Sequence, residues 1–198
     1  MFVYRSLFSL FFLPLILFAE AAFAVDNVRM SWTRELIPLS KTVFQIYDHK
    51  SGKERIVDLT GRDFIIVSVR EEGSDGRFYA VDRDGTVWLS GAVTSGAPQF
   101  RSPSGVFHII QKERHHMSNR YPDESGVNNM DFMMKFTRFG HALHKGSVDW
   151  MSHGCIHISP KDVAVLYRWA QQGMPVVITR DSYMPYARED LRRIYMDY

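Results

Sequence analysis

The stretch FGHALHKGSVDWMSHGCIH, residues 139–157, contains the only cysteine of the chain, Cys155, and four of its eight histidines. Seven of the eight lie between His108 and His157, so they bracket the thiol. A free thiol has a pKa of about 8.5, and only a few per cent is thiolate near neutral pH unless an imidazole or helix terminus activates it. The clustering therefore predicts a cysteine–histidine catalytic site.

The six residues around the thiol favour one local geometry. In a strand-like segment 152–157, the side chains of His153, Cys155 and His157 share a face. Gly154 lets backbone or substrate approach closely, and the amides of Gly154 and Cys155 are placed to receive an oxyanion. His144 lies upstream on a separate predicted strand, from which a base can face the nucleophile.

Residues 139–146 and the Ser-His-Gly-Cys-Ile run at 152–156 resemble the signature of the L,D-transpeptidase catalytic domain, or YkuD-type, family. Residues 94–96 and 102–107 resemble that family's serine-glycine turn and its threonine-proline-glycine-x-phenylalanine strand entry. The similarity extends over residues 63–180. It implies a mainly β, YkuD-like β-sandwich with one main α-helix after the catalytic strand.

The resemblance also implies a reaction. A cysteine attacks the third residue of a peptidoglycan stem tetrapeptide, expels the terminal D-alanine, and yields its acyl group to an amine, forming 3,3 cross-links or exchanging the terminal D-amino acid. Carried over by position, Cys155 is the nucleophile, His144 the base, oriented by the carbonyl after it, His153 a site-lining residue and Gly154 part of the oxyanion hole. Ser152, His157, Trp150 and Lys145 are the candidate substrate-binding residues, with no metal and no cofactor.

Two features depart from the family pattern. His157 occupies the position, two after the nucleophile, where the family usually has arginine. Histidine titrates near pH 6.5 and lacks the planar fork of a guanidinium, so contacts at this position are expected to be weaker and pH-dependent. The spacing from His144 to Cys155 is short, which indicates a trimmed active-site loop.

Short β-branched and aromatic runs separated by turn residues predict strands over 64–69, 77–81, 86–90, 106–110, 132–137, 141–144 and 176–179. Ser159-Pro160 predicts the start of a helix over 161–172, with Gly173 as its stop. Residues 111–129 predict a long polar loop, and residues 183–198 a short charged helix.

The chain is expected to comprise a signal peptide (1–24), an N-terminal extension packed on the next domain (25–61), a catalytic domain (62–181) and a C-terminal tail (182–198). The apolar run after Arg5 spans about 13 residues, fewer than the roughly 20 that a membrane-spanning helix needs. We therefore expect the protein to be exported, with the periplasm as the expected location and the cell wall or medium as the alternative. No stable membrane insertion is expected once the signal is removed.

The formal net charge of +2 argues against a nucleic-acid partner. Peptidoglycan stem peptides are the expected partners, and the oligomeric state is unknown. Three alternatives stay open: an L,D-carboxypeptidase or endopeptidase with the same site, a histidine-rich metal site, and a noncatalytic wall-binding protein. The metal alternative is disfavoured because neither a Cys-x-x-Cys pair nor a helical His-x-x-x-His pair is present.

Overall fold

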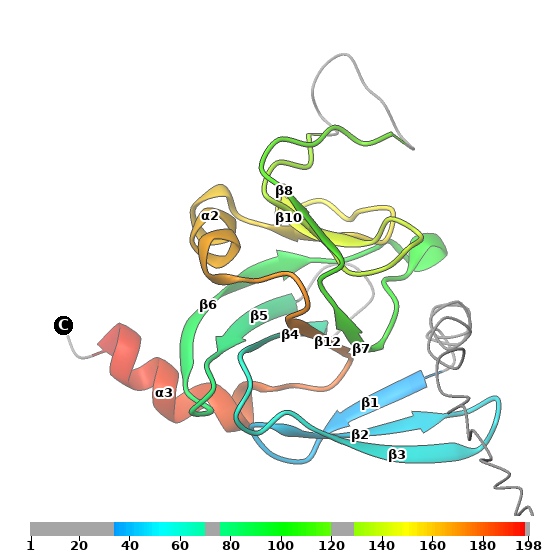
Figure 1. The fold of residues 1–198 in the computed structure, drawn as a ribbon, viewed down its shortest axis with the longest axis vertical. Helices are drawn as coiled ribbons and strands as arrows, with labels where there is room; N and C mark the ends of the chain where they lie inside the picture. Colours follow the sequence, from blue (N-terminus) through cyan, green and yellow to red (C-terminus); the bar gives the residue numbers. More distant parts are fainter. Residues whose placement is uncertain (1–33, 70–75, 120–128, 197–198) are drawn as a thin grey trace, which may run out of the picture.

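The computed structural model describes residues 34–69, 76–119 and 129–196. The predicted signal peptide, 1–24, lies outside these residues, as do the first nine residues of the expected extension. The chain is mainly β, as predicted (Figure 1). The strands are β1 (Arg34–Pro38), β2 (Val43–Asp48), β3 (Lys53–Asp58), β4 (Phe64–Val69), β5 (Gly76–Val81), β6 (Val87–Thr94), β7 (Gly105–His108), β8 (Gln111–Glu113), β9 (Met133–Lys135), β10 (Ala142–Lys145), β11 (Ile156–Ile158) and β12 (Pro175–Thr179).

Nine of these strands form one curled sheet in the order β7-β12-β4-β5-β6-β11-β10-β9-β8. Two neighbouring pairs, β12–β4 and β10–β11, are parallel, and the other pairs are antiparallel. The strands predicted over 64–69 and 77–81 are present as the antiparallel pair β4–β5, whereas β8 is a strand within the segment predicted as a loop. Pairing with β9 explains β8, because a polar edge strand carries no apolar alternation that the sequence could reveal.

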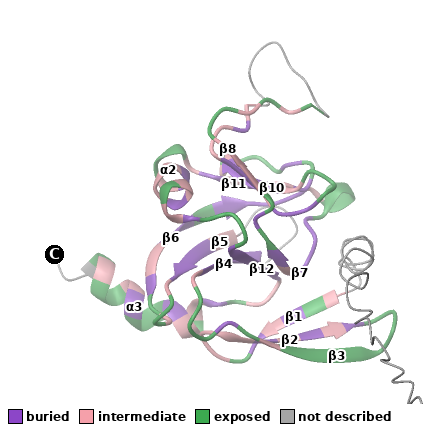
Figure 2. Cartoon of the chain, in the orientation of Figure 1, coloured by how far each residue is buried: buried purple, intermediate pink, exposed green. Residues whose placement is uncertain are grey.

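Strand β4 lies in the middle of the molecule, with all six residues buried (Figure 2). Its odd-numbered residues, including Ile65 and Val67, face a core that continues into helix α2, Pro160–Trp169. Its even-numbered residues Phe64 and Ile66 face a second core on the other side of the sheet. Alternate side chains of a strand point to opposite faces, so a strand covered on both faces is apolar throughout.

The second core is closed by a separate antiparallel sheet, β1-β2-β3, and by helix α3, Met184–Met196. Leu36, Phe44 and Ile46 of this small sheet are buried against the main sheet, so the described part of the extension packs as expected. Strand β3 is largely exposed (Figure 2). Helix α3 confirms the helix predicted in the tail.

Helix α2 begins as its sequence predicts. The Ser159 hydroxyl accepts a hydrogen bond from the Asp162 N–H at 3.2 Å, and Pro160 occupies the first turn. The helix ends at Trp169, three residues before the predicted end, because Ala170 adopts extended backbone. Val163 and Leu166 anchor it on the first core, beside the strands that carry the candidate site.

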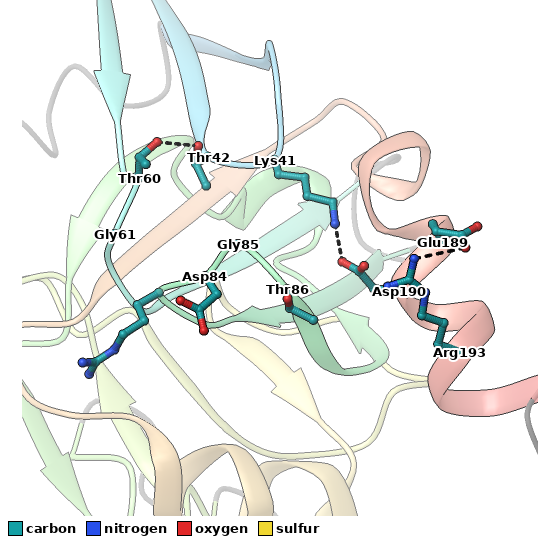
Figure 3. Close-up of a pocket in the computed structure, with 11 residues that line it drawn as sticks. Lys41, Thr42, Thr60, Gly61, Asp84, Gly85, Thr86, Glu189, Asp190 and Arg193 are labelled. Atoms are coloured by element: carbon teal, nitrogen blue, oxygen red, sulfur yellow. Dashed lines mark hydrogen bonds and ion pairs between the residues drawn. The ribbon is translucent and has the colours of Figure 1, made fainter.

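A polar cavity of about 420 Å³ lies where the turns after β1, β3 and β5 meet α3 (Figure 3). Two ion pairs line it: Lys41 binds Asp190 at 2.6 Å, and Arg193 binds Glu189 at 3.4 Å. Asp190 also accepts the Val87 N–H at 3.0 Å. These contacts join the small sheet, the main sheet and α3. Within the described residues, no helix is long and apolar enough to cross a membrane.

Candidate active site

Two short parallel strands place the candidate catalytic residues. Strand β10 pairs with β11 so that His144 lies beside His157, and β11 pairs antiparallel with β6 so that His157 lies beside Thr94. Residues 146–155 connect the two parallel strands without a helix, which makes them a short crossover. Cys155, directly before β11, and His144 of β10 therefore line the same pocket.

His144 is 5% exposed and has a fixed tautomer. Its Nδ1–H donates to the carbonyl oxygen of Lys145 at 2.7 Å, the orientation expected from the residue that follows it. The lone pair of the neutral ring is then on Nε2. Burial, with a further contribution from His157, lowers the pKa of His144 to about 3, so the ring is a neutral base at physiological pH.

Cys155 is half-buried in the same pocket. Its thiol donates to the Gly140 carbonyl oxygen, with Sγ 3.7 Å from that atom. Burial raises the pKa of the Cys155 thiol to about 11, although a hydrogen bond from the Ala142 backbone acts in the opposite direction. The pair is therefore a neutral thiol and a neutral imidazole rather than a preformed ion pair.

The residues before the thiol form a tight turn and not the strand that the sequence predicted. Ser152 Oγ accepts the Gly154 N–H at 3.0 Å and donates to the Cys155 carbonyl at 2.6 Å. Gly154 has φ +108°, and a Cβ there would lie 2.8 Å from the His141 ring. The strand pattern fails because this left-handed residue reverses the alternation of side chains.

The backbone of Gly154, which was expected to contribute to the oxyanion hole, is hydrogen-bonded within this turn. Its N–H is already bonded to Ser152, and its carbonyl accepts the Ser102 hydroxyl at 2.9 Å. Gly154 is therefore held in the turn through both its N–H and its carbonyl. Ser152, predicted to bind substrate, likewise uses its hydroxyl to shape the turn.

Two segments earlier in the chain stabilise this turn through hydrogen bonds. The Gly96 N–H donates to Ser102 Oγ at 3.0 Å, and the Ser152 N–H donates to the Ser95 carbonyl at 3.0 Å. A Cβ at Gly96 would lie 1.9 Å from the Phe100 carbonyl oxygen and 2.8 Å from Gly154 Cα. Through these contacts, segments 94–96 and 102–107 support the turn at residues 152–155, which we call the nucleophile turn.

The pocket in front of Cys155 and His144 has a volume of about 600 Å³. All of the other predicted residues except Gly154 line it. Trp150 is 75% exposed at the rim, and the ring of His153 lies 4.7 Å from that of Phe100. The ammonium of Lys145 is 3.0 Å from Asp131, so this lysine is already paired with a carboxylate.

Sequence reasoning missed three contributors to the site. His141 lines the pocket, with Nδ1 2.9 Å from Thr137 Oγ1, and contacts Gly154. Arg138 lines it from the turn between β9 and β10, and Ser102 supports the nucleophile turn. The Gly-His sequence at 140–141 could have indicated His141, whereas only the folded chain brings Ser102 to Gly154. In the described part of the chain, no group of three or more His, Cys, Asp or Glu side chains is placed to hold a metal ion.

Comparison with known proteins places this site in a family. Residues 62–178 match the family model of the L,D-transpeptidase catalytic domain, YkuD. An Enterococcus faecium L,D-transpeptidase mutant superposes with a TM-score of 0.51 at 17% identity, covering 79% of each chain. L,D-transpeptidase 1 of Mycobacterium tuberculosis has a TM-score of 0.46 at 21% identity, covering 71% of this chain and 73% of that one. No curated protein sequence matches the chain.

Proposed function

The chain belongs to the L,D-transpeptidase catalytic domain family, and from this premise we propose that it remodels peptidoglycan stem tetrapeptides through a thioester on Cys155. The observation that carries the proposal is the shared pocket of about 600 Å³, whose wall includes both the half-buried Cys155 and the buried His144. A thiol with an oriented neutral base fits nucleophilic catalysis.

In the first half-reaction, His144 Nε2 takes the thiol proton as Sγ attacks the carbonyl carbon of the third stem residue. The Nδ1–H bond to the Lys145 carbonyl, 2.7 Å long, stabilises the imidazolium that forms. The Cys155 N–H is the proposed donor to the oxyanion, since Gly154 N–H is used elsewhere. The tetrahedral adduct then breaks its C–N bond, and the leaving D-alanine amine receives the proton from His144.

In the second half-reaction, the acceptor is the amine of a neighbouring stem. His144 removes a proton as the amine attacks the thioester, and the C–S bond breaks to restore the thiol. An incoming D-amino acid gives exchange by the same steps, and water gives a tripeptide. His144 thus acts alternately as base and as acid. A neutral ring can do both, because Nε2 accepts and returns the proton while Nδ1–H stays bonded to the Lys145 carbonyl.

The charge of the pocket supports an anionic substrate. Among the described lining residues are Lys135, Arg138 and Lys145, but neither aspartate nor glutamate. Stem peptides carry free carboxylates, and a cationic cleft concentrates such ligands. Arg138 is an exposed lining cation and is our candidate to receive a carboxylate, whereas Lys145 is paired with Asp131.

The test is mass spectrometry of disaccharide-tetrapeptides incubated with residues 25–198, with Cys155→Ala as control. We expect D-alanine release, cross-linked dimers and an enzyme adduct of the tripeptide mass, all lost in the variant. Tripeptides as the only product would assign the carboxypeptidase reaction instead. Wall binding without turnover would refute the catalytic proposal.

We also propose that the protein acts outside the cytoplasm. The proposal is supported by the signal-like segment 1–24 and by the location of the proposed substrate. Fusing residues 1–30 to a reporter enzyme that folds only outside the cytoplasm tests this directly. Activity of the fusion is expected, and a cytoplasmic, uncleaved fusion would contradict it.

A further inference from the structure

His157 holds the loop that joins the base to the nucleophile. Its Nδ1 lies 3.1 Å from the Ser147 carbonyl oxygen and 3.2 Å from that of Trp150. Because both neighbours are acceptors, Nδ1 carries the proton and donates to them. The hydroxyl of Thr94 donates to the same two carbonyls at 3.0 and 3.1 Å. His157 and Thr94 are paired across β11 and β6, so two adjacent strands hydrogen-bond to the same turn, residues 147–150.

The ring of His157 is also enclosed by the site. It meets the His144 ring edge to face, with centroids 4.9 Å apart, and the two residues are register partners in β10 and β11. On the loop side it lies against Gly146, where an added Cβ would be 2.5 Å from Cγ of the ring. The imidazole therefore fills the space between the loop and the base.

The loop that His157 holds begins directly after the group that orients the base. The Lys145 carbonyl fixes the His144 tautomer, Gly146 N–H donates to the Ile158 carbonyl at 3.0 Å, and Trp150 forms the pocket rim. Movement of residues 147–150 would therefore reach both the base and the rim. Misplacing reacting groups by about 1 Å can reduce a rate by about 100-fold.

We propose that His157 is a positioning residue: with Thr94 it clamps the turn at residues 147–150 through the Ser147 and Trp150 carbonyls, and so keeps His144 and the pocket rim in their reactive arrangement. The catalytic part of this inference rests on the proposed function. The clamp itself is a property of the loop and is measurable without turnover. Burial lowers the pKa of His157, which is consistent with a neutral ring whose single N–H is used for the clamp.

Four variants separate the effect of the hydrogen-bond donor from that of the ring. His157→Phe keeps a flat ring and removes the donor, whereas His157→Asn places an amide N–H close to the position of Nδ1. Thr94→Val removes the other donor with little change of shape. Gly146→Ala leaves His157 intact but forces its ring to move, because of the 2.5 Å approach.

The first readout is hydrogen exchange of residues 146–152 in each folded variant. We expect about tenfold faster exchange in His157→Phe and Gly146→Ala, and near-normal exchange in His157→Asn, because opening of this loop is then local. The second readout is turnover of disaccharide-tetrapeptide. We expect kcat to fall about 10- to 100-fold in His157→Phe with KM changed less than about threefold, and His157→Asn to restore most of kcat.

Each outcome decides the clamp. Normal exchange in His157→Phe, or equal losses in His157→Phe and His157→Asn, would overturn it. If His157→Phe does not fold, Thr94→Val and Gly146→Ala decide by the same exchange measurement. If the wild type turns over no stem peptide, the proposed function fails, while faster exchange rescued by asparagine still supports the clamp.

Discussion

Replacing Ser152 by alanine tests how the nucleophile turn is stabilised. Ser152 is 6% exposed, and its hydroxyl both accepts the Gly154 N–H and donates to the Cys155 carbonyl. The substitution leaves a buried donor and an acceptor without their partner. Each buried group that loses its partner costs about 1–3 kcal/mol, so Ser152→Ala should lower the free energy of unfolding by about 2–6 kcal/mol.

The same loss should reach catalysis, because the two hydrogen bonds span the backbone on either side of the thiol. We expect kcat to fall about 100-fold through misplacement of Cys155. The assay is urea denaturation followed by circular dichroism, together with D-alanine release from tetrapeptide. The matched control is Ser51→Ala: Ser51 is exposed in the turn between β2 and β3, and a surface change of this kind costs at most about 0.5 kcal/mol. Equal stability of the two variants would refute this account of the turn.

Three further predictions concern the same site. Because burial raises the pKa of Cys155 to about 11, the thiolate fraction should increase with pH throughout the range 7 to 10. The rate of alkylation by iodoacetamide without substrate should therefore increase about tenfold per pH unit. An alkylation rate that stays constant below pH 6 would instead indicate a thiolate–imidazolium pair. Gly96→Ala places a Cβ 1.9 Å from the Phe100 carbonyl oxygen and should cost more than about 3 kcal/mol, read as a lowered Tm, whereas unchanged stability would mean that the chain relaxes around the methyl group. Arg138→Gln should raise KM for tetrapeptides with free carboxylates about two- to fivefold at low salt. The increase should be smaller in 0.5 M salt or when the stem carboxylates are amidated. An equal increase for free and amidated stems would show that Arg138 does not recognise a carboxylate.

Several parts of the fold were predictable because their signals are local. Strand β4 and the start of α2 are encoded in a few adjacent residues, an apolar run in the first case and Ser159-Pro160 in the second. Strand β8 and the small sheet β1-β2-β3 were missed. Strands β3 and β8 are polar, so pairing rather than composition makes them strands. Strand β2, with the sequence VFQIYD and alternating burial, did carry a local strand signal.

Local sequence by itself determined the reactive groups: one thiol, a cluster of histidines around it, and a glycine next to it. Those are covalent facts, and they sufficed to single out Cys155 and His144 as the candidate pair and to indicate the family. The charge states of the pair were not contained in them. Burial raises the pKa of the thiol and lowers that of the imidazole, and burial depends on strands distant in the chain.

The roles of the neighbouring residues were decided only by tertiary structure. Alternation along a strand placed His153, Cys155 and His157 on one face, yet the positive φ of Gly154 breaks that pattern and turns its amide toward Ser152. His157 faces backbone carbonyls because β6 and β10 flank it, and Thr94, 63 positions earlier, shares the same acceptors. Hydrogen-bond partners are assigned by distance in space, and the order of residues along the chain does not specify that distance until the sheet has formed.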